Sequence, residues 1–210
     1  MDTFILILEI IGTVSFAASG GIVAVKKSMD IFGVCILGVT TAVGGGMIRD
    51  IILGLTPPSA LVNSRYIVIS ILVSLLIFIP FIRRIITAKP LLYEFLMLSA
   101  DSVGLGVFTV YGLKVGIESG FSENPLLLIF ISVVTGVGGG VLRDIFAGER
   151  PYIFKKHIYA CAAIAGALLS YLLWRPFGQG LSMVSGLILI VIIRFLAAKF
   201  RWSLPKAKSF

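Results

Sequence analysis

Seven apolar stretches, divided by short polar connections, run along the chain from end to end. Their approximate ranges are 3–25, 31–53, 64–82, 91–113, 125–147, 158–174 and 180–198. Each is close to the roughly 20 residues that an α-helix needs to cross the hydrocarbon core of a bilayer. Because backbone amides find no water partner in lipid, each stretch is predicted to be helical. The pattern therefore predicts an all-α membrane protein with seven transmembrane helices.

The composition excludes a water-soluble globular protein. Hydrophobic residues make up 58% of the 210 residues and charged residues only 13%, whereas soluble domains carry about 25% charged residues. The apolar stretches fill nearly the whole chain, which leaves no room for a soluble catalytic domain. The net charge of +8 resides mainly in the connections and the C-terminal tail. It therefore indicates orientation in the membrane and not the binding of nucleic acid.

Basic residues are distributed unevenly between the two sides that seven crossings define. One side holds three of them, Arg65, Lys114 and Arg175. The other side holds twelve: Lys26, Lys27, Arg83, Arg84, Lys89, Arg150, Lys155, Lys156, Lys199, Arg201, Lys206 and Lys208. Since cytoplasmic connections are enriched in lysine and arginine, the second side is predicted to be cytoplasmic. The N-terminus then lies outside and the C-terminus inside, which suits a multi-pass protein of a prokaryotic plasma membrane.

The chain also contains an internal repeat. Residues 43–54 match residues 137–148 with eight of twelve positions identical, at a constant offset of 94. Upstream, Glu9 and Phe16 align with Asp101 and Phe108 at an offset of 92. Each copy holds three apolar stretches, and because three is odd, the second copy enters the membrane from the opposite side. We expect inverted three-helix repeats at 1–83 and 84–174, followed by a seventh helix and a basic cytoplasmic tail at 175–210.

Both copies carry three consecutive glycines in the middle of a span: Gly44, Gly45, Gly46, Gly138, Gly139 and Gly140. Glycine costs a helix roughly 1 kcal/mol relative to alanine, so the second and fifth helices are expected to kink or unwind there. Freed carbonyl groups would suit a partly dehydrated monovalent cation. Thr41 and Thr135, one turn earlier, would add hydroxyls to the same path. Two simpler alternatives stay open: glycines that serve only close helix packing, and threonines that bond their own helix backbone.

Ionisable residues lie within the predicted spans as well: Glu9, Arg49, Asp50, Asp101, Arg143 and Asp144. Such residues are costly in a membrane and usually face a bundle interior or water. Adjacent Arg and Asp side chains do not face each other on a helix, so we expect Glu9 to pair with Arg49. Asp101 is expected to pair with Arg143 in the same way. These pairs would either line and gate a pore or clamp the repeat interface. Arg194 is expected to snorkel to the cytoplasmic interface.

Enzyme motifs are not supported by their sequence context. Residues 45–54 superficially resemble the head motif of tRNA nucleotidyltransferases, but residues 55–60 contain none of the aspartates that bind magnesium there. A phosphate-binding loop needs Lys-Ser or Lys-Thr after its glycines, and a dinucleotide-binding fold needs soluble strands. Cys35 and Cys161 lie alone in apolar stretches and form no metal-binding pattern. We therefore predict no enzyme, no cofactor and no metal beyond transient potassium.

The duplicated Gly-Gly-Gly-x-x-Arg-Asp motif, the plan of two three-helix repeats plus one helix, and the external N-terminus resemble a known family. They are similar to the prokaryotic relatives of the trimeric intracellular cation (TRIC-type) channels, whose duplicated domain is known as an uncharacterised or "glycine transporter" domain. The resemblance covers about residues 4–200. It implies a homotrimer in the lipid bilayer, with an hourglass pore in each subunit that conducts potassium and, to a lesser extent, sodium. It places the pore constriction at residues 44–46 and 138–140, on kinked helices 2 and 5.

Two other functions are compatible with the repeat. A secondary transporter of a small zwitterion such as glycine would bind the substrate carboxylate at the amide end of an unwound helix. A non-conducting membrane scaffold would need the glycines for packing alone. The resemblance favours a cation channel over both.

Overall fold

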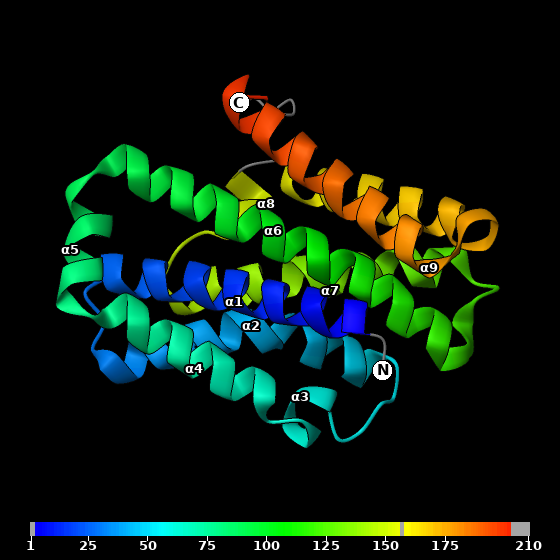
Figure 1. The fold of residues 1–210 in the computed structure, drawn as a ribbon, viewed down its shortest axis with the longest axis horizontal. Helices are drawn as coiled ribbons and strands as arrows, with labels where there is room; N and C mark the ends of the chain where they lie inside the picture. The colour runs from blue at the N-terminus through cyan, green and yellow to red at the C-terminus, as the bar shows by residue number, and fades with distance from the viewer. Residues whose placement is uncertain (1–2, 156–157, 203–210) are drawn as a thin grey trace, which may run out of the picture.

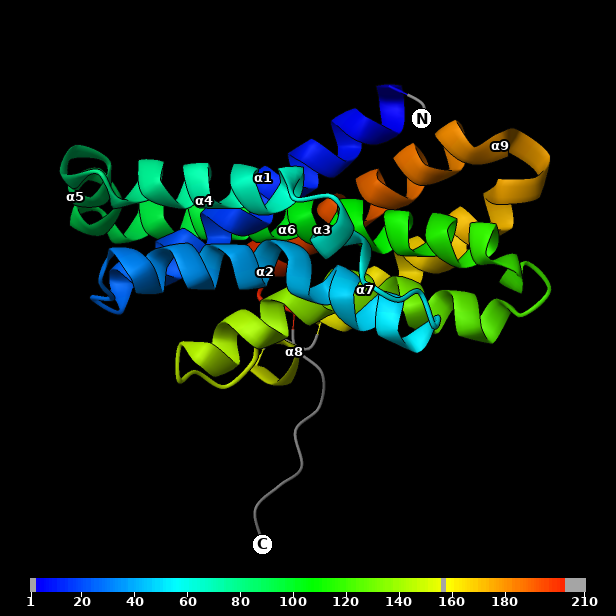
Figure 2. The same ribbon diagram turned by 90° about the horizontal axis from the view of Figure 1, so that it is seen from below.

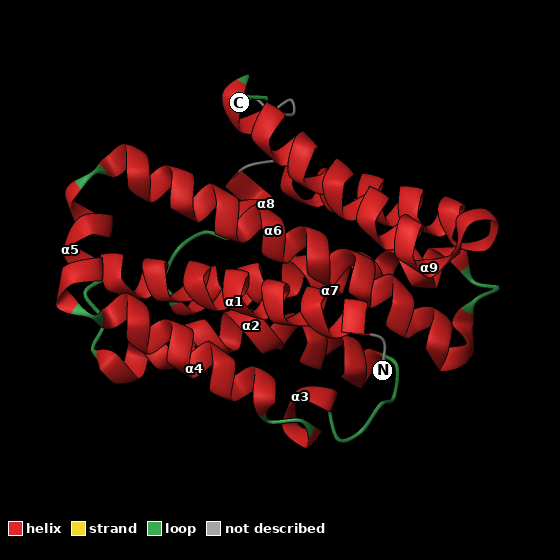
Figure 3. Ribbon diagram, viewed as in Figure 1, coloured by secondary structure: helices red, strands yellow, loops and turns green. Residues whose placement is uncertain are grey.

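The computed structural model describes residues 3–155 and 158–202, and all regular secondary structure in this described part is helical, with no β-strand (Figure 3). The elements are α1 (Thr3–Lys26), α2 (Ile31–Ile52), α3 (Ser59–Val62), α4 (Arg65–Phe78), α5 (Pro80–Ala88), α6 (Pro90–Gly116), the π-helical turn η1 (Ile117–Phe121), α7 (Pro125–Phe146), α8 (Tyr152–Lys155) and α9 (Ile158–Lys199). Within the described ranges, five helices are long and apolar enough to cross a membrane, or six if α4 and α5 count as one bent span. The all-helical membrane fold predicted from the sequence is confirmed.

The third predicted span, 64–82, is not one straight helix. α4 ends at Phe78, and α5 leaves it at an angle of 75°. Pro80 has no backbone N–H and disfavours the α conformation at Ile79, which is extended at φ −52° and ψ 129°. The sequence-based expectation overlooked this proline because the apolar pattern continues through it.

α9 is 42 residues long, about twice the length that one crossing requires. It contains a break at Gly178, whose φ of 77° and ψ of 174° are non-helical and easily reached only without a Cβ. Pro176 lies two residues earlier. Figure 1 shows that the chain reverses direction near this break, so that the two arms of α9 lie alongside each other.

Four helices form the centre of the bundle. α1 packs on α2 and α6, and α7 packs on the same two helices. On one flank, α4 covers α1 and α2; on the other, α9 covers α6 and α7. The α6–α7 connection and the turn of α9 lie at one end of the long axis, whereas α5 and the α1–α2 connection lie at the other (Figures 1 and 2). The start of α1 points toward the first of these ends, and α3 lies near the middle.

The glycine triplets mark the crossing of α2 and α7. A Cβ at Gly45 would lie closer than 3.0 Å to the carbonyl oxygen of Thr135, and one at Gly139 would lie equally close to that of Thr41. Both helices nevertheless run as continuous α-helices through the triplets. The expected unwinding is therefore wrong, whereas the kink stays a prediction. These two glycines bring the backbones together while each helix remains α-helical.

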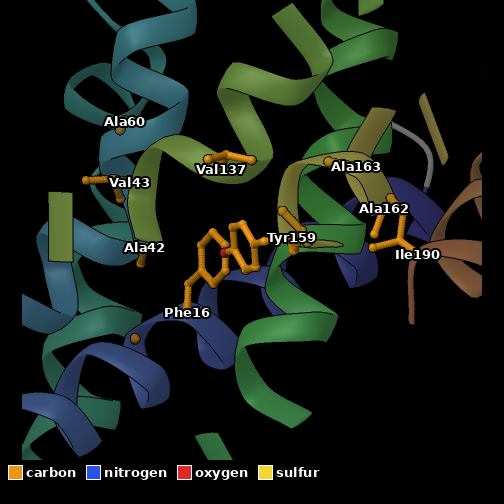
Figure 4. Close-up of a cluster of buried hydrophobic side chains, with 11 residues drawn as sticks. Phe16, Ala42, Val43, Ala60, Val137, Tyr159, Ala162, Ala163 and Ile190 are labelled. Atoms are coloured by element: carbon orange, nitrogen blue, oxygen red, sulfur yellow. The ribbon is translucent and has the colours of Figure 1, made fainter. Parts of the chain in front are cut away.

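A second crossing, between α1 and α6, repeats this arrangement with aromatic rings. The Phe16 ring occupies the space where a Cβ of Gly104 would be, and the Phe108 ring lies 3.2 Å from the Cβ position of Gly12. The two rings lie 5.3 Å apart between centroids. Phe16 also belongs to the central cluster of buried side chains in Figure 4, which joins residues of α1, α2, α3, α6, α7 and α9. The two crossings thus form one packed core.

Gly45→Ala should destabilise the protein, and Gly46→Ala should not. A methyl at position 45 overlaps a backbone carbonyl that cannot move aside, which costs about 1–3 kcal/mol. At position 46 the nearest atom to a Cβ is 3.6 Å away, on the flexible Arg49 side chain, so the gain in helix propensity of up to about 1 kcal/mol remains. The thermal unfolding midpoints of the purified variants check this. Equal midpoints for the two variants would contradict the tight crossing.

Candidate functional site

Each copy of the motif ends in an arginine–aspartate pair of adjacent residues. Arg49 Nε donates to Asp50 Oδ1 at 2.8 Å, and Arg143 Nε donates to Asp144 Oδ1 at 2.9 Å. The expectation that such neighbours do not meet is wrong. The long arginine stem lets the guanidinium fold over onto the next carboxylate, whereas the spacing rule concerns where the two side chains leave the helix.

The second carboxylate oxygen of each aspartate holds the chain that follows. Asp50 Oδ2 accepts hydrogen bonds from the backbone N–H of Ser59 at 2.8 Å and from its hydroxyl at 2.6 Å. Asp144 Oδ2 accepts a hydrogen bond from the backbone N–H of Tyr152 at 2.7 Å. Asp50 and Asp144 therefore fix equivalent turns at the ends of α2 and α7.

Asp101 on α6 is the centre of a buried charge cluster. Its Oδ1 lies 2.6 Å from Arg143 Nη1, so the expected ion pair is present. Its Oδ2 lies 3.2 Å from Arg194 Nη2, on the second arm of α9. Tyr159 OH donates to Oδ1 at 3.3 Å, and the Arg194 guanidinium lies 4.6 Å from the Tyr159 ring centroid. Ser19 Oγ accepts a further bond from Arg143 Nη1.

The cluster balances its own charge. Two carboxylates, Asp101 and Asp144, face two guanidinium groups, Arg143 and Arg194, and all four residues are buried, with at most 4% of their surface exposed. Buried ions are tolerated when they are paired and hydrogen-bonded. The expectation that Arg194 snorkels to the interface is wrong: position along the chain placed it near the membrane surface, but its side chain points into the bundle toward α6.

Glu9 behaves differently from its counterpart Asp101. Arg49 pairs with Asp50, and no Glu9–Arg49 ion pair forms within the described chain, so the second expected pair is absent. Glu9 is 5% exposed, and its Oε2 accepts no hydrogen bond from the described residues. It lines a cavity of about 40 Å³, which we name the Glu9 cavity. The other lining residues are Thr13, Ala42, Val43, Gly46, Arg49, Ser59, Ala60, Tyr66, Phe108 and Tyr111.

A larger cavity, which we name the basic cavity, has a volume of about 850 Å³. Its lining includes four basic residues near helix ends, Lys26, Lys27, Arg150 and Arg201. Asp144 and Arg194 also line it, so the Asp101 cluster borders this cavity. On α1, Glu9 and Val23 belong to different cavities. They are separated by about 21 Å of helix, at 1.5 Å per residue.

The remaining predicted site residues lie between or beside the cavities. Gly44 contacts the Leu142 side chain, Gly138 faces Gly45, and Gly140 lies near the Tyr159 hydroxyl. The Thr41 and Thr135 hydroxyls donate to Leu37 O and Ile131 O of their own helices at 2.6 Å. Neither threonine lines either cavity. The simpler interpretation of the threonines, backbone bonding within the helix, therefore holds.

Sequence reasoning missed several members of the site. Tyr66 and Tyr111 line the Glu9 cavity, and Tyr159 joins the Asp101 cluster. One signal was available: at the offset of 92 that aligns Glu9 with Asp101, Ser19 aligns with Tyr111. Ser19 contacts Arg143, and the Tyr111 ring lies 5.3 Å from the Arg49 guanidinium. Tyr159 lies within the second copy, 93 residues after Tyr66, which lines the Glu9 cavity. Arg194 had no such signal, because it lies outside both copies of the repeat.

The fold and the site define a polytopic helical membrane protein with buried charge clusters and two cavities that charged side chains line in part. A family model described as "Glycine transporter" matches residues 6–81 and 98–175. A UPF0126 membrane protein of Deinococcus radiodurans is 37% identical over 200 residues, which cover 94% of this chain and 89% of that protein. The UPF0126 inner membrane protein YadS of Escherichia coli K12 is 35% identical over 202 residues, which cover 94% and 93%.

Solved structures match over almost the full length. A prokaryotic TRIC channel in 0.5 M KCl superposes with a TM-score of 0.87 at 32% identity, covering 97% of this chain and all of that one. A TRIC trimeric intracellular cation channel orthologue from Rhodobacter sphaeroides gives a TM-score of 0.86 at 33% identity, covering 96% and 100%. The chain belongs to the prokaryotic TRIC-type family, whose duplicated domain is described as "Glycine transporter".

Asp101→Asn should destabilise the protein by about 3–5 kcal/mol, because it leaves two buried arginines facing one carboxylate. Adding Arg194→Gln restores neutrality and should recover part of the loss. Arg175→Gln is the matched control. Arg175 forms a 2.6 Å ion pair with Glu123, but their side chains are 72% and 84% exposed. The loss of this pair should therefore not change the midpoint of thermal unfolding measurably. Thermal midpoints measure all three effects. A double variant no more stable than Asp101→Asn alone would contradict the charge-balance account.

Proposed function

We propose that this protein is a channel for monovalent cations that prefers potassium, with one ion path in each subunit of a homotrimer. Its similarity to solved TRIC cation channels over almost the whole chain supports this function. The path runs from the Glu9 cavity, past the α2–α7 crossing and the Asp101 cluster, to the basic cavity.

The observation that carries the proposal is the pair of cavities, each lined in part by charged side chains, that lie toward opposite ends of α1. Between them lie Phe16 and Arg143, which are 1% and 0% exposed. We assign this arrangement to a closed state. Opening must separate the contacts around these two side chains, because a partly hydrated potassium ion cannot pass a tightly packed, dry core.

The proposed arrangement in the membrane has seven crossings. α4 with α5 forms one crossing, and the two arms of α9 form two. Residues 1–83 and 84–174 then form inverted repeats, with the seventh helix and the tail at 175–210. The N-terminus lies outside and the C-terminus inside a prokaryotic plasma membrane, in keeping with an inner membrane protein among the relatives. The Glu9 cavity then belongs to the outer half and the basic cavity to the cytoplasmic half.

Transport of a small zwitterion such as glycine is the second candidate, and the description of the matching family model favours it. Such a transporter commonly binds the substrate carboxylate at the exposed amide end of a discontinuous helix. α2 and α7 are continuous through their glycines and offer no such end. This continuity favours the channel.

The purified protein in a planar bilayer should give unitary potassium currents without a co-substrate. Gly46→Leu should lower the unitary conductance severalfold, because the new side chain fills the Glu9 cavity. Gly180→Leu is the control, since nothing lies within 4 Å of its Cβ position, and it should conduct like the wild type. Saturable, ion-coupled glycine uptake with no unitary current would favour the transporter and contradict the channel.

Cysteine labelling tests the proposed orientation. In a protein with Cys35 and Cys161 replaced by alanine, a membrane-impermeant maleimide should label Ser122→Cys in intact spheroplasts. It should label Ser28→Cys only after permeabilisation, because the α1–α2 connection is assigned to the cytoplasm. Labelling of Ser28→Cys in intact spheroplasts would reverse the topology.

A further inference from the structure

The two carboxylates at equivalent places in the duplicated sequence have unequal partners. Asp101 lies within 3.2 Å of two guanidinium groups, those of Arg143 and Arg194. Glu9 is buried to a similar degree, yet its Oε2 has no hydrogen-bond partner in the described chain. An ionised carboxylate is costly to bury unless it is paired.

The difference arises because Arg194 belongs to the last arm of α9, which has no counterpart in the first copy. At the Asp101 cluster, two acidic and two basic side chains give a net charge of zero. At the Glu9 cavity, Glu9 and Asp50 face Arg49 alone, which leaves one negative charge. Asp50 already lies 2.6 Å from Arg49 Nη2, so the guanidinium charge is compensated locally. Glu9 interacts with the Tyr66 and Tyr111 side chains by hydrogen bonding, but no basic side chain forms an ion pair with it in the described chain.

The Glu9 cavity has the size and chemistry to hold a small cation. About 40 Å³ holds about three water-sized spheres at roughly 10–15 Å³ each. Oxygen-bearing side chains line it: the Glu9 carboxylate and the hydroxyl residues Thr13, Tyr66 and Tyr111. Oxygen donors suit alkali cations. Within the described part of the chain, no three His, Cys, Asp or Glu residues gather as a divalent metal site would require.

We propose that the Glu9 cavity binds one monovalent cation, held by Glu9 Oε2 and neighbouring hydroxyl oxygens. The cation lies beside Glu9 and compensates its charge, as the Arg194 guanidinium does beside Asp101. If the protein is the channel proposed above, this site is a binding site for the permeating ion, and that role rests on the proposed function. Binding itself does not require conduction, so the two claims can be tested separately.

Thallium, a heavy mimic of potassium, tests the site directly. Crystals of the full-length protein soaked in thallium nitrate should show an anomalous peak beside Glu9 Oε2. Glu9→Gln should lose this peak, whereas Glu123→Gln, a control at an exposed carboxylate, should keep it. A diffracting wild-type crystal without the peak would overturn the proposal.

Thermal unfolding provides a readout that needs no crystals. Replacing choline by potassium at ten times the dissociation constant and constant ionic strength should raise the wild-type midpoint by roughly 3–6 °C. Glu9→Gln should show no such rise, and in choline it should be at least as stable as the wild type, because it removes a buried unpaired charge. The same potassium shift in both proteins would overturn the site. If thallium binds but bilayers show no unitary current, the site stands and the channel function fails. If bilayers conduct but thallium does not bind, the channel function stands and the site fails.

Discussion

The close approach of α2 and α7 is the constraint on which the rest of the structure depends. Gly45 and Gly139 each pack against a carbonyl oxygen of the other helix, where a Cβ would lie closer than 3.0 Å. Because lipid offers no hydrophobic driving force between helices, close backbone packing is a principal source of their association. The crossing holds the two halves together, sets Phe16 against Gly139, and brings Arg143 within reach of Asp101. The two cavities lie on either side of it.

Duplication supplies the framework of the site, and the unduplicated arm of α9 makes its two halves different. The arginine–aspartate pairs and the phenylalanine–glycine contacts repeat from one half to the other. Arg194 is added to one half only, where it completes a neutral buried cluster around Asp101. The other half keeps a carboxylate with an open oxygen beside a cavity. Two copies of one motif thus provide a neutral buried cluster around Asp101 and the proposed cation site at Glu9.

Much of the fold was predictable, because membrane insertion demands long apolar helices and the duplicated motif stands in register. The apolar pattern predicted the all-helical membrane fold, and the predicted Asp101–Arg143 pair is present. Side-chain contacts within the bundle were less accessible. The sequence did not predict that Arg49 pairs with Asp50, that Arg194 points into the bundle, or that the glycine triplets remain helical. Each of these outcomes depends on what packs against the residue. The apolar pattern also failed to predict the bend between α4 and α5 at Pro80, because apolar residues continue on both sides of the proline. Tertiary packing, which no local pattern encodes, decided these cases.

The central claim is that each subunit contains its own cation path through the Glu9 cavity. The most direct test is to block single channels of a variant that carries Gly46→Cys and in which Cys35 and Cys161 are replaced by alanine. An impermeant cationic thiol reagent should abolish the potassium current of a single trimer in three successive equal steps, as the path of each subunit closes in turn. An unchanged current after complete modification, verified by mass spectrometry, would contradict the claim.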